Sequence, residues 1–585
     1  AKTEEDTCPG ELTPLMPSKQ QQSCEVTPLM PSKLSLRYPS LHWFLSSTGI
    51  DDLAESFGCK LLIMLFASQH LMKGFATSFT GLPASFLYKA YKVPGPQLQI
   101  FGGVTQLPWA MKPIIGLISD ALPIGGYHKA PYMLIASVLG VASLLAVGAI
   151  PQSHLGVEQL VVCLFLVQLQ FSSCDLLTEA KYAEKMQKHP EQGPALMTYV
   201  WGGLQFAALI AIASVGPVMR NFGVRAPYLA ALLPAASIFL PLACNYLEEE
   251  RETAKQSALA RERLLEQHEA CALCVLMLVG TVGLVVLGVL YESALVNAVA
   301  ALVVAAVMLA AFSVLLRPII AKVNAFFLVQ TSLAVSISGA AFYFFTDGPE
   351  QYPEGPHFSM EFYTSVLGVV GNLCSLLGIF TYQAYMSKWT YRSLLLMTNV
   401  VFCVLSLSDL VLFSRLNVRW GIPDQAFVLG GSALTSVVMQ WMWMPGVVIL
   451  SQLCPKGMEA TMYALLAGCH NLGNTIASSC GALVLELLGV SPKGEPHESG
   501  QFDRLWVAAA ISIVMPMFTL ILLPWLIPDA RQTDKLLEED DRDASTGSLW
   551  RRWTGERRTR TPSWSSASTS ESLSGSEMTS ISASP

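Results

Sequence analysis

Charged side chains are scarce in this sequence. Asp, Glu, Lys and Arg make up 14% of the 585 residues, whereas soluble proteins carry about a quarter. Hydrophobic residues make up 52% of the chain, and the mean hydropathy is +0.46. This composition excludes an ordinary soluble domain and predicts an all-α, polytopic membrane protein. The net charge is −7 and no large basic field is present, so we expect no nucleic-acid partner.

Sequence signatures of several other protein classes are missing as well. The dipeptide Gly-Lys, which the phosphate-binding loop of an ATP-driven pump needs, occurs nowhere in the chain. No repeated filter sequence or ring of charges suggests a channel. The single Cys-x-x-Cys, Cys271 to Cys274, has no second pair and no histidine cluster nearby, so it predicts helix packing rather than a metal site. We therefore expect no metal, no cofactor and no enzymatic activity.

About fourteen apolar segments define the domain organisation, because each is near the roughly 20 residues that a helix needs to cross a bilayer. The segments lie at about 60–88, 96–120, 130–150, 158–186, 194–219, 226–247, 271–291, 294–316, 321–346, 360–385, 391–414, 425–452, 460–489 and 503–527. The sequence thus predicts the following parts: a disordered tail with a duplicated Thr-Pro-Leu-Met-Pro-Ser-Lys segment (1–55), a six-helix bundle (56–247), a charged linker helix (248–270), two additional spans (271–317), a second six-helix bundle (318–528) and a disordered Ser/Thr/Arg-rich tail (529–585).

Lysines and arginines concentrate in the loops on one predicted side of the membrane. These loops hold Lys129, Lys185, Lys188, the basic residues from 251 to 263, Arg317, Lys322, Lys388, Arg392 and Lys456. Because cytoplasmic loops carry the excess of positive charge, both termini are expected in the cytoplasm. We further expect a monomer in the plasma membrane.

The second span carries a polar face inside an apolar segment. On a helix this face holds Thr105, Trp109, Lys112, Gly116 and Asp120, which are three or four residues apart. An ammonium group left in hydrocarbon costs at least a few kcal/mol, so Lys112 must find a carboxylate, a carbonyl group or water.

The fourth span offers such carboxylates. Gln168, Ser172, Asp175 and Glu179 share one helical face, and the two acids lie at the same predicted depth as Lys112. Lys73 lies near the middle of the first span, where it suits an anionic substrate or pairs with a carboxylate such as Asp175. Two interpretations stay open: these ion pairs only allow polar residues to fold inside the membrane, or they serve gating or proton coupling.

The second bundle contributes aromatic and amide side chains. Trp441 and Trp443 precede Pro445, and one of these rings could stack on a flat heterocycle, although a packed or lipid-facing tryptophan is the commoner case. Further along, Asn471, Asn474 and Ser478 recur at helical spacing after His470. Buried amides can also tie helices together, and a histidine on an apolar helix is more often a hydrogen-bonded core residue than a proton relay.

Three blocks of residues together resemble the folate–biopterin transporter family of the major facilitator superfamily. They are Trp109-x-x-Lys112-Pro-x-x-Gly116-x-x-Ser-Asp120 with Gly126-Tyr-His128-Lys129-Ala-Pro-Tyr132, then Asp175-x-x-x-Glu179-Ala-x-Tyr-Ala-Glu184, and finally Cys454-Pro-x-Gly-x-Glu459-Ala-Thr. The loop with Gly116, Asp120, His128 and Lys129 is similar to the superfamily's gating loop, but it is longer and has His128 where an arginine is usual.

The resemblance implies two six-helix bundles around a central cavity, alternating access, and uptake of folate or biopterin as a proton symporter. Candidate substrate-binding or coupling residues are Lys73, Lys112, Asp175, Glu179, Trp441 and Asn471, and Glu459 marks the motif of the second half. Two alternatives remain: a transporter of S-adenosylmethionine from the same family, and a membrane sensor that transports nothing. Only a measurement of flux separates the sensor from a transporter.

Overall fold

The computed structural model describes residues 50–253, 262, 267–454, 459–537 and 544–555. It divides into two units, residues 1–58 and residues 59–585. In the first unit the described part is helix α3 (Ile50–Phe57), whose first turn carries Asp51 and Asp52. Acidic side chains are favoured there because the helix dipole places partial positive charge at this end. The predicted duplication in the N-terminal tail lies outside the described residues.

The second unit is built from helices. The helices up to residue 243 are α4 (Cys59–Leu65), η1 (Phe66–Ala76), α5 (Thr77–Gly81), α6 (Ala84–Ala90), α7 (Gly95–Ala110), α8 (Lys112–Ala121), α9 (Ala130–Ala149), α10 (Val157–Lys188), η2 (Pro190–Gln192), α11 (Gly193–Phe222), α12 (Ala226–Ala230), α13 (Leu232–Ala236) and α14 (Phe239–Ala243). Two long helices follow, α16 (His268–Leu290) and α17 (Ala294–Leu315).

The remaining helices belong to the second half. They are α18 (Pro318–Leu333), α19 (Ser338–Thr346), η3 (Phe362–Val366), α20 (Leu367–Thr381), η4 (Tyr382–Met386), α21 (Tyr391–Phe413), α22 (Leu416–Arg419), α23 (Asp424–Gln452), α24 (Glu459–Leu488), η5 (Ser499–Phe502), α25 (Leu505–Val514), η6 (Met515–Phe518), α26 (Thr519–Leu526) and α27 (Leu549–Thr554). In the described residues β-structure is limited to two isolated bridges, Ile124 with Tyr127 and Thr390 with Arg531.

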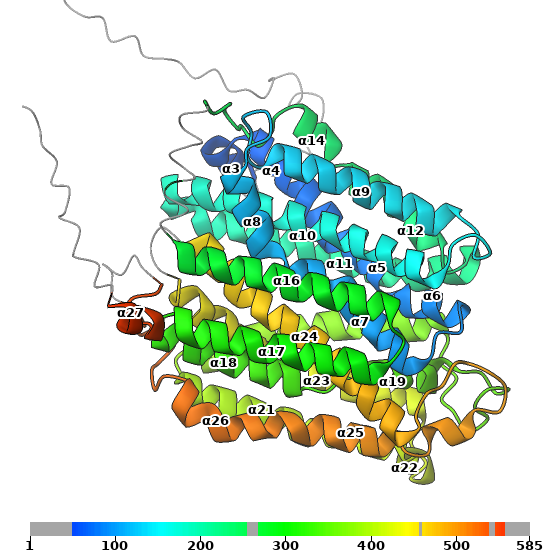
Figure 1. The fold of residues 1–585 in the computed structure, drawn as a ribbon. Coiled ribbons are helices and arrows are strands. Elements are labelled where there is room, and N and C mark those ends of the chain that lie inside the picture. Colours follow the sequence, from blue (N-terminus) through cyan, green and yellow to red (C-terminus); the bar gives the residue numbers. More distant parts are fainter. Residues whose placement is uncertain (1–49, 254–261, 263–266, 455–458, 538–543, 556–585) are drawn as a thin grey trace, which may run out of the picture. The chain divides into compact units, whose positions relative to one another are not determined.

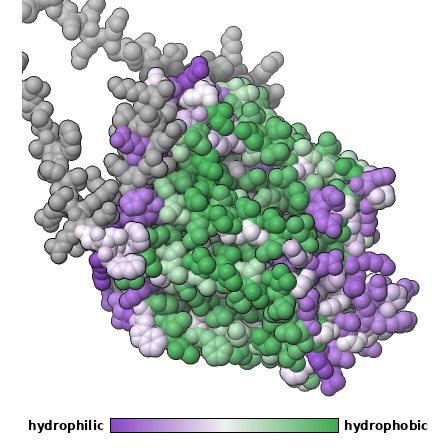
Figure 2. Space-filling view, in the orientation of Figure 1, coloured by the Kyte–Doolittle hydropathy of each residue, from purple (hydrophilic) through white to green (hydrophobic). Residues whose placement is uncertain are grey.

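In the described part of the chain, eleven helical segments are long and apolar enough to cross a membrane. They coincide with eleven of the fourteen predicted spans, and Figure 2 shows a broad apolar surface on the face of the molecule in view. The other three predicted spans are also helical, but two of them are interrupted: the first consists of α4, η1, α5 and α6, and the second of α7 and α8. The third is α24. In the predicted linker helix, Glu248 to Thr253 have no helical structure, and most of the remainder lies outside the described residues.

The first two spans are interrupted for identifiable reasons. The helix η1 is a wide π-helix, a form that often occurs at functional sites. Between α7 and α8 the helix breaks at Met111, because Pro108 and Pro113 have no N–H group to donate along the helix. This break directly precedes Lys112.

The two halves of the unit meet mainly along α7 and α24. The two halves approach closely there: a Cβ atom added to Gly339 of α19 would clash with the carbonyl oxygen of Gly95 of α7, and one added to Gly103 of α7 would lie 3.2 Å from Ser478 Cβ of α24. Gln99 joins the halves by donating from Nε2 to the carbonyl oxygens of Ser336 (3.0 Å) and Ser478 (2.9 Å). Small residues at these crossings permit contacts between membrane helices that larger side chains would block.

The two additional spans bridge this contact. Helix α16 packs on α7 and α8 of the first half, whereas α17 packs on α24 and α18 of the second (Figure 1). The side of α16 that faces α7 is tightly packed at Gly288, where an added Cβ would lie 2.5 Å from Val104 Cγ2. Arg551 of α27 forms an ion pair with Glu269 at the start of α16, with Nε and Oε1 2.7 Å apart. The hairpin of α16 and α17 therefore belongs structurally to both halves.

Candidate functional site

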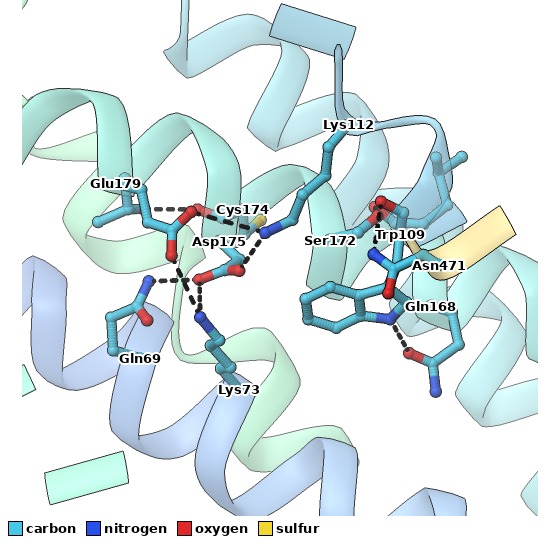
Figure 3. A network of polar contacts seen from close by, with 12 residues as sticks. Gln69, Lys73, Trp109, Lys112, Gln168, Ser172, Cys174, Asp175, Glu179 and Asn471 are labelled. Atoms are coloured by element: carbon cyan, nitrogen blue, oxygen red, sulfur yellow. Dashed lines mark hydrogen bonds and ion pairs between the residues drawn. The ribbon is translucent and has the colours of Figure 1, made fainter. Parts of the chain in front are cut away.

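Asp175 is the centre of a buried ionic cluster within the first half. Its side chain is fully buried on α10, and its two oxygens are bound by different helices (Figure 3). Lys73 Nζ of η1 lies 2.8 Å from Oδ1, and Lys112 Nζ at the start of α8 lies 2.6 Å from Oδ2. Gln69, one turn before Lys73, also donates from Nε2 to Oδ1 at 3.0 Å. Both lysines thus pair with Asp175, which is one of the alternatives that the sequence leaves open for them.

Glu179 belongs to the same cluster but is held less tightly. Its carboxylate oxygens lie 3.3 Å from Lys73 Nζ and 3.6 Å from Lys112 Nζ. Its side chain is 29% exposed, compared with 0% for Asp175. The four charges sum to zero when all groups are ionised, so the lysines have no surplus charge to offer while both carboxylates remain in place.

Two tryptophan rings border the lysines. Lys73 Nζ lies 5.1 Å from the ring centroid of Trp201 on α11, and Lys112 Nζ lies 4.9 Å from that of Trp109 on α7. At these distances the ring faces attract the ammonium groups. Trp109 Nε1 also donates to Gln168 Oε1 at 2.9 Å, which fixes this ring against α10.

Gln168 also lines a cavity of about 150 Å³. It lies between the first, second and fourth spans, and its lining includes Thr80, Tyr88, Gly102, Thr105 and Gln106. Gln168 therefore has the cavity on one side and the tryptophan that flanks Lys112 on the other.

The helix break before Lys112 also explains the position of Asn471. Because Pro113 has no N–H group, the carbonyl oxygen of Trp109, four residues earlier, lacks its helical donor. Asn471 of α24 donates from Nδ2 to this oxygen at 3.3 Å (Figure 3). The structure thus places Asn471 against the backbone of α7, where it ties the second half to the ionic cluster.

The two predicted tryptophans of α23 have different surroundings. Trp441 Nε1 donates to Thr381 Oγ1 at 2.9 Å, and its ring packs on a small apolar cluster that includes Tyr382 and Leu394. Trp443 is 49% exposed and contacts the ring of His470 on α24, with centroids 5.2 Å apart. A role of Trp441 in substrate binding stays a prediction.

The predicted gating loop docks onto the segment that follows the sixth span. His128 donates from Nδ1 to the carbonyl oxygen of Ser119 (2.9 Å), and its Nε2 lies 3.0 Å from Glu252 Oε2. The carboxylate of Glu249 accepts hydrogen bonds from the N–H groups of Lys129 (2.8 Å) and Ala130 (2.9 Å), and so caps the first turn of α9. Burial opposes a charge on His128, but its hydrogen bonds to Glu252 and Ser119 prevail and raise the pKa of His128 above its usual value.

The other residues of the predicted motifs are placed as follows. Gly116 lies on α8, where an added Cβ would be 3.5 Å from Leu176 Cδ2 of α10, and Asp120, near the end of α8, interacts electrostatically with Lys129 and His128. Glu459 is the first residue of α24, and its side chain lies outside the described part of the structure, as do residues 455–458.

Sequence reasoning missed several residues around the cluster. The residue pattern of the fifth span does not distinguish Trp201 from its neighbours. The contact between His470 and Thr331 of α18 depends on how two helices far apart in the chain pack together. Asn471 itself was a predicted candidate, and a signal for its hydrogen bond was available: a proline at 113 leaves the carbonyl group of Trp109 without a donor.

Comparison with known proteins adds relatives of similar length. Probable folate-biopterin transporter 4 of Arabidopsis thaliana is 27% identical over 518 residues, which cover 83% of this chain and 98% of the relative. The folate-biopterin transporter of Synechocystis sp. is 27% identical over 447 residues, covering 75% and 77%. Folate transporter 2 of Plasmodium falciparum is 21% identical, covering 79% and 88%.

Solved structures show the same fold at low sequence identity. A POT family peptide transporter superposes with a TM-score of 0.55 at 12% identity, covering 81% of this chain and 98% of that structure. A D-xylose–proton symporter gives a TM-score of 0.51 at 13% identity, covering 82% and 99%. The predicted major facilitator-type fold is confirmed. The model of the BT1 family matches residues 73–546, most of the chain, so the protein belongs to the BT1 family.

Proposed function

We propose that this protein carries a folate or pterin across the membrane by alternating access, with protons as the coupling ion and without chemical change to its cargo. The names of its relatives support this cargo class. The observation that carries the proposal is the ionic cluster, in which Lys73 and Lys112 share the buried Asp175 and hold the more exposed Glu179 at longer distances. Ionisable residues inside membrane segments commonly mark substrate or proton pathways.

The charge balance of the cluster suggests how protons and cargo are coupled. With all four groups ionised, an anionic cargo has no net positive charge to bind. Protonation of Glu179 leaves the two lysines with only Asp175, so a carboxylate of the cargo can take the place of Glu179. Cargo and proton would then enter together, and the cluster would return to neutrality when both leave.

The proposal includes the setting of the protein in the membrane. Both termini face the cytoplasm, because the loops with Lys129, Lys185 and Lys388 carry the excess of basic residues. The protein acts as a monomer in the plasma membrane. Its cargo is a small molecule that passes through a cavity between the helices.

Uptake measurements test the function directly. Cells expressing the chain are given labelled folate, biopterin or S-adenosylmethionine, with and without a protonophore. We expect folate or biopterin to accumulate and the protonophore to reduce accumulation. Asp175→Asn and Lys73→Ala should abolish uptake, and Glu179→Gln should keep exchange of cargo but lose acceleration by a proton gradient. Surface labelling confirms that each variant reaches the membrane.

Four outcomes would count against parts of this proposal. Uptake of S-adenosylmethionine alone would change the cargo, and absence of any flux despite specific binding would favour a sensor. Normal flux in both Asp175→Asn and Lys73→Ala would remove the cluster from the mechanism. Uptake that is unaffected by the protonophore would remove the coupling.

A further inference from the structure

One face of α24 in the second half is polar and partly open. Tyr463, His470, Asn474 and Ser478 follow one another at helical spacing, and Tyr463 and Asn474 are exposed. The neighbouring faces are occupied: Thr475 Oγ1 donates to the carbonyl oxygen of Gly103 on α7 at 3.1 Å, and Gly473 packs against Thr331 of α18. The polar face therefore lies between a helix of the first half and a helix of the second.

The hydrogen bonds of Thr331 determine what His470 can offer a ligand. Thr331 donates its single hydroxyl hydrogen to the carbonyl oxygen of Phe327. Its oxygen is 3.2 Å from His470 Nδ1, so it must accept a hydrogen from that nitrogen. In neutral imidazole only one ring nitrogen carries a hydrogen, which leaves Nε2 as an acceptor. Among the described residues Nε2 has no hydrogen-bond partner.

Trp443 supplies an aromatic surface beside this acceptor. Its ring lies 5.2 Å from that of His470 at an angle of 61°, and it is 49% exposed. The nearby Trp441 differs, since its Nε1 is bound to Thr381. A flat ring that packs on Trp443 would have its edge close to His470 Nε2.

This pair lies next to the ionic cluster. Asn471, which follows His470 in the chain, is hydrogen-bonded to the carbonyl oxygen of Trp109, and the ring of Trp109 lies 4.9 Å from Lys112 Nζ. Through Asn471 and Trp109, the helix that carries His470 is thus linked to a charged group of the first half. A ligand with an anionic end and a flat, uncharged end would contact both halves at once.

We infer that His470 and Trp443 form the subsite for the flat heterocycle of the cargo. Trp443 stacks on the ring, and His470 Nε2 accepts a hydrogen bond from a ring N–H group, while the lysines of the cluster bind the anionic end. This inference rests on the proposed function and assigns to the second half the recognition of the uncharged part of the cargo. Thr331 is a positioning residue, because it fixes the tautomer of His470.

Inhibition by fragments of the cargo separates the two ends. Uptake of labelled folate is inhibited either with pterin, the heterocycle alone, or with p-aminobenzoylglutamate, the anionic tail alone. Trp443→Leu should raise the pterin concentration for half-inhibition by about three- to tenfold, in line with the energy of an aromatic stack. Inhibition by p-aminobenzoylglutamate should not change. Trp506→Leu is the control, because Trp506 of α25 is similarly exposed (46%), and it should leave both values as in the wild type.

His470 is tested through its acceptor nitrogen. His470→Phe keeps an aromatic ring but removes the acceptor, and it should weaken pterin as an inhibitor several-fold. His470→Gln places an amide oxygen near the position of Nε2 and should restore inhibition. A pterin methylated at its ring N–H should be a poor inhibitor of the wild type, and His470→Phe should weaken it no further.

The outcomes distinguish the two proposals. If the wild type takes up folate but Trp443→Leu and His470→Phe leave pterin inhibition unchanged, or weaken both fragments equally, the inferred subsite is wrong and the transport function stands. If the wild type takes up no folate and neither fragment binds, the proposed function fails and the inference fails with it.

Discussion

At the scale of single residues, the carbonyl oxygen of Trp109 shows how a helix break ties the two halves together. Pro113 removes its helical donor, and Asn471 replaces that donor from the opposite half. A buried carbonyl group without a partner costs about 1–3 kcal/mol. We therefore predict that Asn471→Leu lowers the melting temperature of the purified protein by several degrees.

The control for this prediction lies one turn away on the same helix. Asn474 is exposed, and Asn474→Leu removes an amide of the same size without leaving a carbonyl group unpaired. Its melting temperature should stay close to that of the wild type. Equal losses in both variants would mean that the hydrogen bond to Trp109 adds nothing to stability.

The pairing of residues within the cluster could be predicted from spacing, whereas the residues around it could not. Helical periodicity placed Asp175 and Glu179 on one face, and the cost of an unpaired lysine in hydrocarbon required a carboxylate, a carbonyl group or water for Lys112. Trp201 and the pair of His470 with Thr331 depend on contacts between helices far apart in the chain. Such contacts leave no local pattern in a single sequence.

At the scale of elements, the loop between α8 and α9 depends on the charge of His128. Its raised pKa means that the folded loop binds a proton more tightly than the unfolded chain does. The stabilisation is complete below the unfolded pKa of about 6.5 and disappears as the pH rises through the folded pKa. We predict faster hydrogen–deuterium exchange in residues 122–129 at pH 8.5 than at pH 6, after correction for the intrinsic rate.

Two variants check the origin of this pH dependence. His128→Gln should remove most of the difference between the two pH values, and Glu252→Gln should reduce it, because Glu252 is the acidic partner of His128. A difference of the same size in His128→Gln would assign the effect to another group in the loop.

The spans themselves were predictable, but their interruptions were less so. Apolar length located all fourteen helical segments to within a few residues, because bilayer thickness fixes the length of a spanning helix. The prolines at 108 and 113 are visible in the sequence as causes of the break before Lys112. The π-helix from Phe66 to Ala76 has no proline or glycine signal at its start and depends on packing against α10 and α11.

At the scale of the whole membrane unit, ion pairs join the halves at the end that carries Asp347. Lys89 at the end of α6 lies 2.6 Å from the fully buried Asp347, which follows α19. Arg220 of α11 lies 3.0 Å from Glu361, but this arginine is exposed. If the halves separate here during transport, Asp347→Asn should favour separation, because breaking a buried pair costs about 3–5 kcal/mol. We predict faster hydrogen–deuterium exchange in η3, which packs on α11.

Matched variants separate this buried pair from the exposed one. Arg220→Gln should change exchange in η3 much less than Asp347→Asn does, since exposed ion pairs contribute less than about 1 kcal/mol. The double variant Lys89→Asp with Asp347→Lys swaps the two charges, and it should bring the hydrogen–deuterium exchange rate of η3 partly back toward that of the wild type. Equal effects of Arg220→Gln and Asp347→Asn would contradict a special role of the buried pair.

The neutrality of the cluster has an electrical consequence. Moving one elementary charge through a potential of 100 mV takes about 2.3 kcal/mol, so a carrier with a net charge at its binding site would be driven or hindered by membrane voltage on its empty return. The two ammonium groups and two carboxylates of the cluster carry no net charge together, so the membrane potential does no work on the empty site. Voltage should therefore act on the loaded step alone, through whatever charge the cargo and its protons bring.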